Sequence, residues 1–234
     1  MLDKLVFKVF GYTEAEIRKA LSGIGVTPIS VEEFCRDAKV AIACEDARKD
    51  EFSFQVYDLF RGCVYAERDE SLAEAVLERL RLYGKKLSVA ESLTGGMITS
   101  DLVAVPGCSE SLQEGVVTYS NEAKIARLGV NPATLSTFGA VSSQVACQMA
   151  AGLMRTGVHY ALSTTGIAGP GGGSREKPVG LVYIGVADEI KCEAKECRFT
   201  GTREEIRTLA ANTALFLLWK KIVKPIDFEN MVIE

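Results

Sequence analysis

The chain has 234 residues, of which 47% are hydrophobic and 25% are charged, and its formal net charge is −4. This composition is typical of a globular protein and excludes disordered, collagenous and low-complexity classes. At about 100–200 residues per domain, the length allows one large domain or two small ones.

Residues 1–84 carry 12 Lys+Arg against 16 Asp+Glu, and residues 85–234 carry 15 of each. Neither half has the basic surface that nucleic-acid binding requires, so we expect no nucleic-acid partner. The single histidine, His159, leaves almost no room for a His-based triad or a His-rich metal site. We therefore expect no metal and no cofactor.

The apolar runs are far shorter than the roughly 18–20 residues that span a bilayer. The first residues, MLDKLVFKVFGYTEAE, become charged too early for a secretory signal. The seven cysteines include no C-x-x-C pair, which favours reduced thiols in a reducing compartment. These features predict a cytoplasmic protein without a membrane partner.

Residues 1–84 predict a small α+β domain. Residues 4–10 alternate as in a strand, and Thr13 to Glu16 form a capping box that opens a helix burying Ile17 and Leu21. Further elements follow in order: a strand at 40–45, an ambiguous segment at 52–60 for which we favour helix over strand, and a helix from Ser71 that stops at Gly84.

From Lys85 onward, short β-branched runs alternate with helical patterns. The last helix opens with a second capping box, Thr202 to Glu205. Its predicted buried positions are Ile206, Leu209, Thr213 and Leu217. Strand–helix alternation followed by an antiparallel pair, 179–187 with 191–199, predicts an α/β layered domain with a mixed sheet over 85–234.

Ser92 and Thr94 lie in the segment AESLTGG, between a predicted strand end and a helix start. A serine there sits at the carboxyl edge of a parallel sheet, beside helix N–H groups that stabilise anions. Ser92 is therefore a candidate nucleophile. The alternative is that Ser92 or Thr94 is only a helix cap.

Lys124 lies in the first turn of another predicted helix, in the segment VTYSNEAK. A lysine there opposes the helix dipole, which favours Asp or Glu at a helix start. Such a local violation often marks a functional site. The alternative is an ordinary solvated lysine.

A glycine-rich segment, 164–180, follows the next predicted strand. Its glycines would let the backbone approach a ligand closely, but it is not a Walker loop, and as a bare pattern it is more typical of a flexible surface loop. Arg203 and Arg207, four residues apart at the start of the last helix, could clamp a phosphate or simply pair with Glu204 and solvent.

Several blocks of sequence occur together in one order: AESLTGG, VPGCSE, EGVVTYSNEAK, FGAVS, TGIAGPGGG, EKPVGLVYIGVA and FTGTREEIR. From about Leu87 to Lys221 the chain closely resembles the C-terminal domain of the CinA (competence/damage-inducible) family, whose stand-alone relatives are nicotinamide-nucleotide amidases. Residues 1–84 resemble the small KH-type domain that precedes it. By this resemblance we expect a two-domain form, 1–84 and 85–234, without the larger molybdopterin-binding-like domain of full-length members.

The resemblance implies hydrolysis of the carboxamide of nicotinamide mononucleotide to nicotinate mononucleotide and ammonia. It implies Ser92 as the nucleophile, Lys124 as its partner and Tyr119 as a supporting hydroxyl. Family members usually carry cysteine where this chain has Leu93, so a cysteine nucleophile is impossible at that position. A homodimer is the family-based expectation.

A neutral lysine is the obvious base when no catalytic histidine is available, but an unperturbed lysine is only about 0.04% neutral at pH 7. Burial and the helix N-terminus would both lower the pKa of Lys124. Oxyanion donors are expected at the N–H groups of Gly95 and Gly96, or near Gly166, and Arg203 is a better phosphate ligand than Arg207. The predicted substrate-binding set is Thr94, Gly95, Gly96, Thr165, Gly166, Gly169, Gly171, Arg203 and Arg207.

Two other functions fit the same sequence. One is a non-catalytic nucleotide-binding or interaction protein linked to competence or DNA damage, although such a protein has no need of Ser92, Tyr119 and Lys124 together. The other is an amidase for a different nucleotide-linked amide. RNA binding by residues 1–84 is disfavoured, because that segment is acidic and has no basic Gly-x-x-Gly loop.

Overall fold

The computed structural model describes residues 2–223, which divide into two compact units between Ala75 and Val76. Residues 224–234 of the predicted second domain lie outside the described residues. Each unit has its own sheet and is described by itself.

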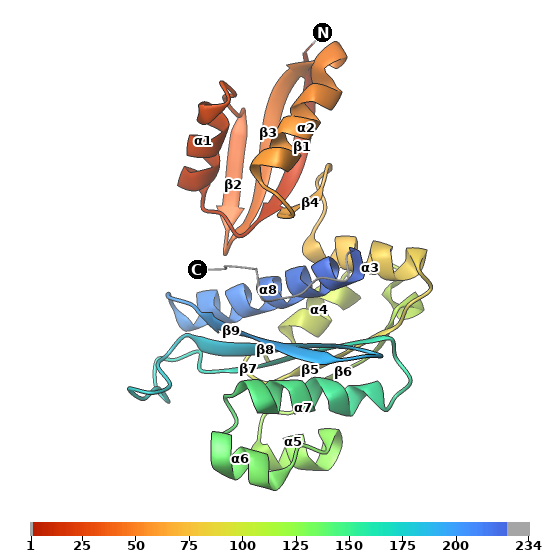
Figure 1. Cartoon of the computed structure of the whole chain (residues 1–234), viewed down its shortest axis with the longest axis vertical. Coiled ribbons are helices and arrows are strands. Elements are labelled where there is room, and N and C mark those ends of the chain that lie inside the picture. Colours follow the sequence, from red (N-terminus) through yellow and green to blue (C-terminus); the bar gives the residue numbers. More distant parts are fainter. Residues whose placement is uncertain (1, 224–234) are drawn as a thin grey trace. The chain divides into compact units, whose positions relative to one another are not determined.

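The first unit is built on a four-stranded antiparallel sheet with the strand order β2-β3-β1-β4 (Figure 1). The unit also contains two helices, α1 and α2. In chain order the elements are β1 (Leu2–Phe10), α1 (Glu14–Gly23), β2 (Ser30–Phe34), β3 (Asp37–Glu45), a 3-10 turn (Asp46–Arg48), α2 (Lys49–Leu59) and β4 (Val64–Ala66).

Local sequence signals explain most of this unit. The capping box at the start of α1 is present: the Glu16 carboxylate accepts the Thr13 N–H at 2.7 Å, and Thr13 Oγ1 accepts the Glu16 N–H at 3.3 Å. Ile17 and Leu21 are fully buried, as predicted. Helix α2 confirms the helical alternative for 52–60, whereas β2 and β4 were not predicted from the sequence.

Helix α3 (Leu72–Leu82) spans the division between the two units. Ser71 and Glu74 form its capping box, with the Ser71 N–H donating to the Glu74 carboxylate at 2.7 Å. The helix ends before Gly84, whose φ of +61° is a left-handed conformation that favours glycine. The predicted start and stop signals of this helix are both confirmed.

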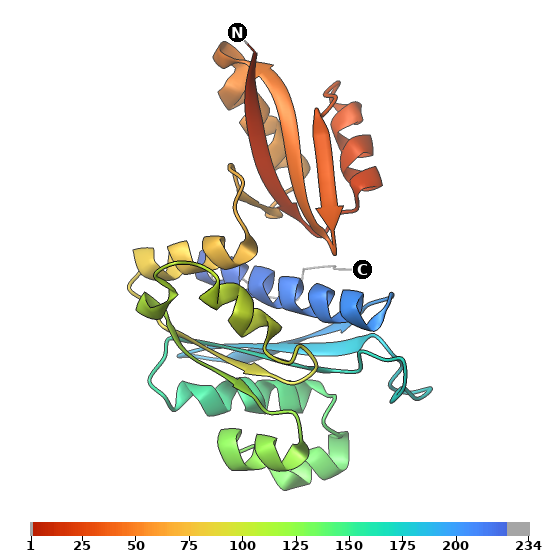
Figure 2. The same ribbon diagram turned by 180° about the vertical axis from the view of Figure 1, so that it is seen from behind.

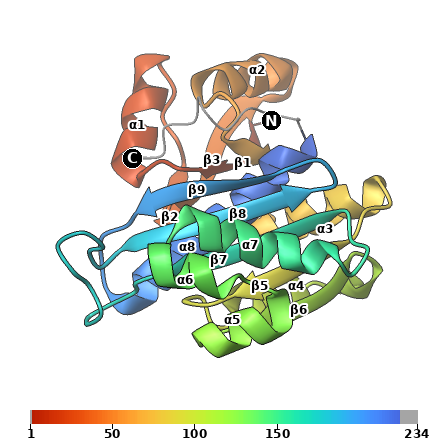
Figure 3. The same ribbon diagram turned by 60° about the horizontal axis from the view of Figure 1, so that its bottom comes forward.

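The second unit is built on a five-stranded mixed sheet with the strand order β6-β5-β7-β8-β9 (Figure 3). Strands β5, β6 and β7 are parallel, and β8 and β9 continue the sheet antiparallel to their neighbours. This confirms the predicted α/β layered architecture. The strands are β5 (Leu87–Glu91), β6 (Leu112–Val117), β7 (Tyr160–Gly166), β8 (Leu181–Asp188) and β9 (Cys192–Arg198).

Helices cover both faces of this sheet. Helices α4 (Met97–Val103) and α8 (Arg203–Val223) lie on one face, and α5 (Asn121–Leu128), α6 (Pro132–Phe138) and α7 (Ser143–Met154) lie on the other, as Figures 1 and 2 show from opposite sides. The unpredicted α6 starts at Pro132, and Asn131 caps it by accepting the Ala133 N–H.

The buried face of α8 differs in one position from the prediction. Ile206, Thr213 and Leu217 are buried, but Leu209 is only half-buried. Fully buried Ala210 and Ala211 occupy that level of the helix instead. The small alanine side chains let α8 pack closely on the sheet. This packing sets the position of the helix that carries Arg203 and Arg207. No described helix, within residues 2–223, is long and apolar enough to span a bilayer.

The strand register brings three chain segments to one edge of the sheet. Glu91, the last residue of β5, lies opposite Val117 of β6 and Thr164 of β7. After β5 the chain continues into β6, which pairs with one edge of β5, and later into β7, which pairs with the other edge. Ligand sites in α/β sheets form at such a switch point, outside the carboxyl ends of the strands.

Candidate active site

Ser92 follows β5 directly and begins a tight turn into α4. Its N–H donates to the Thr164 carbonyl at 3.1 Å, and only 8% of the residue is exposed. Gly95 and Gly96 have φ values of +63° and +98°, which other residues rarely adopt. The two glycines therefore allow the turn that holds Ser92 at the carboxyl edge of the sheet.

Glu91 anchors this turn, a role that was not predicted from the sequence. The side chain is fully buried, and its carboxylate accepts the N–H groups of Gly96, Ile98 and Thr99 at 2.9–3.2 Å and the Thr99 hydroxyl at 2.6 Å. A carboxylate at a helix N-terminus satisfies N–H groups that have no partner within the helix. The Gly96 N–H is already engaged by Glu91, and its predicted role as an oxyanion donor stays a prediction.

Lys124 lies in the first turn of α5, and only 1% of the residue is exposed. Its Nζ atom is 3.1 Å from Ser92 Oγ, 2.8 Å from the Thr118 carbonyl oxygen and 3.1 Å from the Tyr119 carbonyl oxygen. Among the described residues, no carboxylate forms an ion pair with it. The structure thus brings the two predicted residues together in a buried site.

Burial lowers the pKa of Lys124 to about 8, because an ammonium group loses hydration there without gaining a counter-charge. With that pKa, roughly one molecule in ten carries the neutral amine at pH 7. A neutral amine has two N–H donors and one lone pair. With its two N–H groups directed at the carbonyls of Thr118 and Tyr119, the lone pair is available to the Ser92 hydroxyl proton.

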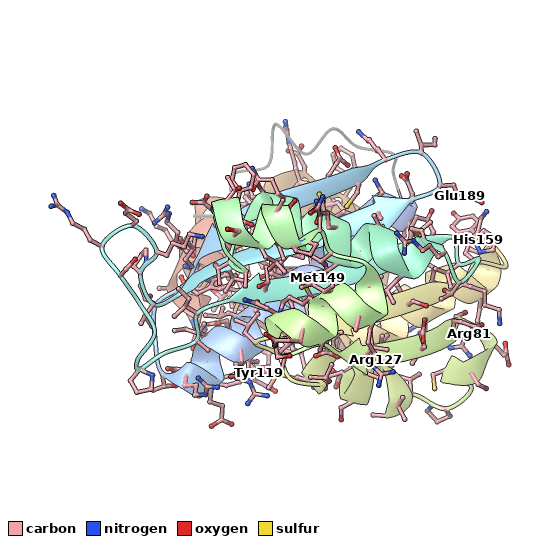
Figure 4. The ribbon with its side chains drawn as sticks, turned by 90° about the horizontal axis from the view of Figure 1, so that it is seen from below. Arg81, Tyr119, Arg127, Met149, His159 and Glu189 are labelled. Atoms are coloured by element: carbon pink, nitrogen blue, oxygen red, sulfur yellow. The ribbon has the colours of Figure 1, made fainter. Side chains whose placement is uncertain are left out.

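Tyr119 contributes differently from the prediction. Its side chain is on the surface, where the residue is 65% exposed (Figure 4), and its contact with Lys124 is made by its backbone carbonyl. Among the described residues its hydroxyl has no hydrogen-bond partner. No contact of this hydroxyl with Ser92 or Lys124 supports its predicted role, which stays a prediction.

The hydroxyls of Thr94 and Thr165 are both used inside the fold. Thr94 Oγ1 lies 2.8 Å from Thr164 Oγ1 in a fully buried pair, and Thr165 Oγ1 donates to the Ala140 carbonyl at 2.8 Å. The first contact joins the Ser92 turn to β7, and the second joins β7 to the segment before α7. The predicted part of both threonines in substrate binding stays a prediction.

The glycine-rich segment is fastened at two points. Arg203 of α8 donates through Nη1 to the Gly169 carbonyl at 2.6 Å. Lys177, which was not singled out from the sequence, donates through Nζ to the carbonyls of Val141, at 2.7 Å, and Phe138. The segment between these contacts is exposed, and Gly171 has open space around it.

Gly166 has a packing reason for being glycine. A Cβ atom there would lie 2.8 Å from the Leu181 carbonyl oxygen and from Val182 Cγ2 on the neighbouring strand. Close pairing of β7 with β8 therefore accounts for this residue without a ligand. Its predicted part in substrate binding stays a prediction.

Arg207, in the second turn of α8, does not present a free guanidinium group. Its Nε donates to the Leu93 carbonyl at 3.0 Å, and its Nη2 donates to the Thr94 carbonyl at 2.7 Å. Two of its five N–H donors therefore point at the backbone of the Ser92 turn, and its predicted role in binding phosphate stays a prediction.

His159 lies at the opposite end of the sheet from Tyr119 (Figure 4). Its Nδ1 accepts the Lys86 N–H at 3.0 Å, which is a structural contact at the start of β7. Within the part of the chain that the structure describes, no group of three or more His, Cys, Asp or Glu side chains could hold a metal ion.

Comparison with known proteins identifies the family of this chain. The model of the CinA C-terminal domain family matches residues 69–222, which is more than half of the chain. The chain belongs to the CinA family. A protein from Caldicellulosiruptor saccharolyticus named as competence-damage inducible is 40% identical over 230 residues, covering 93% of this chain and 56% of that protein.

Other CinA relatives match a smaller share of this chain. A CinA-like protein from Kosmotoga olearia is 49% identical over 162 residues, covering 69% of this chain and 39% of its own length. The chain thus spans about half or less of the length of these two relatives. The crystal structure of competence/damage inducible protein CihA from Agrobacterium tumefaciens is 45% identical, with a TM-score of 0.61, covering 63% of this chain and 91% of that one.

Further solved CinA structures have the same fold at lower identity. A CinA superfamily protein from Klebsiella pneumoniae is 34% identical, with a TM-score of 0.63, covering 65% of this chain and 96% of that one. These proteins are named for competence or damage induction. Their names specify no reaction.

Proposed function

We propose that this chain is an amidase that hydrolyses the carboxamide of nicotinamide mononucleotide to nicotinate mononucleotide and ammonia. The observation that carries the proposal is the 3.1 Å contact between Ser92 Oγ and the Nζ atom of a buried lysine that has no counter-ion within residues 2–223. An amide is a poor electrophile, so its hydrolysis needs both an activated nucleophile and stabilisation of the oxyanion.

In the first half-reaction, Lys124 accepts the Ser92 hydroxyl proton while Oγ attacks the carboxamide carbon. The tetrahedral intermediate then collapses as the C–N bond breaks, and the Lys124 ammonium returns a proton to the departing nitrogen to give ammonia. Ser92 is left esterified. The two carbonyls that accept hydrogen bonds from Nζ keep the amine in place while it exchanges this proton.

In the second half-reaction, water attacks the ester carbon and gives its proton to Lys124. The bond to Oγ breaks, the carboxylate product leaves, and Ser92 regains its proton. Lys124 therefore acts first as base and then as acid, which requires a pKa not far from the working pH; its pKa of about 8 fits that requirement.

The phosphate of the substrate needs a cation, and Arg203 is the candidate that remains. Its side chain reaches the Gly169 carbonyl through Nη1, and the residue is exposed at the start of α8. We infer that Arg203 binds the phosphate together with N–H groups of the glycine-rich segment. The Arg203→Ala variant should raise KM for the mononucleotide; an unchanged KM would remove Arg203 from the site.

The decisive experiment measures ammonia release from nicotinamide mononucleotide by the wild-type chain, Ser92→Ala and the surface control Arg127→Met. Release by the wild type and the control, with none from Ser92→Ala, is the expected result. Equal release by Ser92→Ala would move the chemistry away from Ser92. No release by the wild type would contradict the assignment of this substrate.

A further inference from the structure

Three consecutive backbone N–H groups next to Ser92 have no acceptor in the part of the chain that the structure describes. The Ser92 N–H donates to Thr164, and the Gly96 N–H donates to Glu91. Between them, the N–H groups of Leu93, Thr94 and Gly95 have no hydrogen-bond partner among the described residues. Successive free N–H groups in a turn form a concave site that favours negative charge.

Arg207 binds the carbonyl side of two of these peptide groups. The Leu93 carbonyl belongs to the same peptide group as the Thr94 N–H, and the Thr94 carbonyl belongs to that of the Gly95 N–H. Arg207 donates to both carbonyls, at 3.0 and 2.7 Å. Hydrogen bonding of a cation to a carbonyl polarises the peptide group, which makes its N–H a stronger donor.

We propose that Arg207 is a positioning residue that orients and polarises the Thr94 and Gly95 N–H groups, so that they stabilise the oxyanion formed when Ser92 attacks a carbonyl. This inference rests on the proposed function, because it assigns Ser92 as the nucleophile. It replaces the Gly95 and Gly96 pair expected from the sequence with Thr94 and Gly95, and it gives Arg207 a role other than binding phosphate.

The surroundings of Arg207 hold its guanidinium group in place. It extends from a helix of 21 residues whose next turns are buried, and the two carbonyls that it binds are 113 and 114 residues away in sequence. A Cβ atom on Gly95 would lie 3.4 Å from Arg207 Nη2, so the guanidinium closely backs the turn. The planar fork of arginine fits two carbonyls at once, whereas lysine offers a single ammonium group.

The test uses the full chain with Arg207→Lys, Arg207→Met and the surface control Arg127→Met. Two rates are measured: turnover of nicotinamide mononucleotide, and labelling of Ser92 by a fluorophosphonate, whose phosphoryl oxygen gains charge as Oγ attacks. We expect both rates to fall about 10- to 100-fold in Arg207→Met, with KM within about twofold of the wild type. Arg207→Lys should restore only part of the loss.

The outcomes separate the two claims. If the wild type is not labelled at Ser92, the proposed function fails, and the role of Arg207 fails with it. If the wild type is labelled and both Arg207 variants are labelled equally fast, only the role of Arg207 is overturned. A rise in KM with unchanged kcat and unchanged labelling would show that Arg207 binds the phosphate and does not position the N–H groups. Arg207→Lys keeps the charge and decides the matter if Arg207→Met does not fold.

Discussion

Ser92 and Lys124 are 32 residues apart in sequence, yet their side chains meet at 3.1 Å, because each follows the carboxyl end of one of two paired parallel strands. Ser92 comes directly after β5, and Lys124 lies in the helix that follows β6. The sheet therefore sets their separation, and neither residue depends on a mobile loop for its position.

Replacing Lys124 by methionine removes the proposed base and keeps an unbranched, apolar side chain of similar length. We expect Lys124→Met to lower kcat for ammonia release by about 10²- to 10⁴-fold, the usual contribution of general acid–base catalysis. Steady-state turnover with nicotinamide mononucleotide measures it, with Lys19→Met on α1 as a surface-lysine control. Near-normal turnover by Lys124→Met would refute the Ser–Lys mechanism.

The pKa of Lys124 predicts how activity depends on pH. Because the proposed mechanism uses the neutral amine as the base, kcat/KM should rise about tenfold per pH unit below pH 8 and level off above it. A profile measured from pH 6 to pH 9.5 tests this expectation. A flat profile across pH 8 would show that Lys124 does not supply the base.

The same pKa predicts a change in stability of defined sign. The native pKa of about 8 lies below the ordinary value of 10.5, so between these values the unfolded chain binds more protons than the native one. The free energy of unfolding should therefore rise with pH in this window, by about 2 kcal/mol between pH 7 and pH 10. Urea denaturation measures it, and Lys124→Met should lack this component of the rise.

Much of the fold could be predicted from the sequence, because helix caps and strand–helix alternation are local patterns. The capping boxes at Thr13, Ser71 and Thr202 are visible within four residues, and each is present in the structure. The strand–helix alternation after Lys85 likewise predicts the mixed sheet. Strand β2 was not predicted because only one of its five residues is buried, so the alternation of hydrophobic residues is weak.

The candidate site is only partly readable from the sequence. Ser92 and Lys124 stand at strand–helix junctions, and such positions can be recognised. The roles of Glu91 and Arg207 depend on where their side chains point, and Arg207 binds carbonyls more than a hundred residues away. An acidic residue directly before the turn was the available signal for Glu91, and the sequence offered none for the direction of the Tyr119 side chain.

Glu91→Gln tests whether the buried carboxylate holds the turn. The amide nitrogen of glutamine would face N–H donors that now point at a carboxylate oxygen, so we expect a loss of about 2–4 kcal/mol in the free energy of unfolding. Urea denaturation measures this loss, with the exposed Glu189→Gln as the matched control. If both variants were equally stable, the hydrogen bonds to Glu91 would not stabilise the fold.

Lys177→Met tests what fastens the glycine-rich segment. The Nζ atom of Lys177 donates to the carbonyls of Phe138 and Val141, and methionine cannot replace either hydrogen bond. We expect the segment to open more often, which should speed tryptic cleavage after the exposed Arg175 several-fold and raise KM for the mononucleotide. Ser92 labelling should not change, because Lys177 does not contact the Ser92 turn. Limited proteolysis alongside Lys19→Met measures the first effect, and an unchanged cleavage rate would mean that Arg203 and the backbone hold the segment without Lys177.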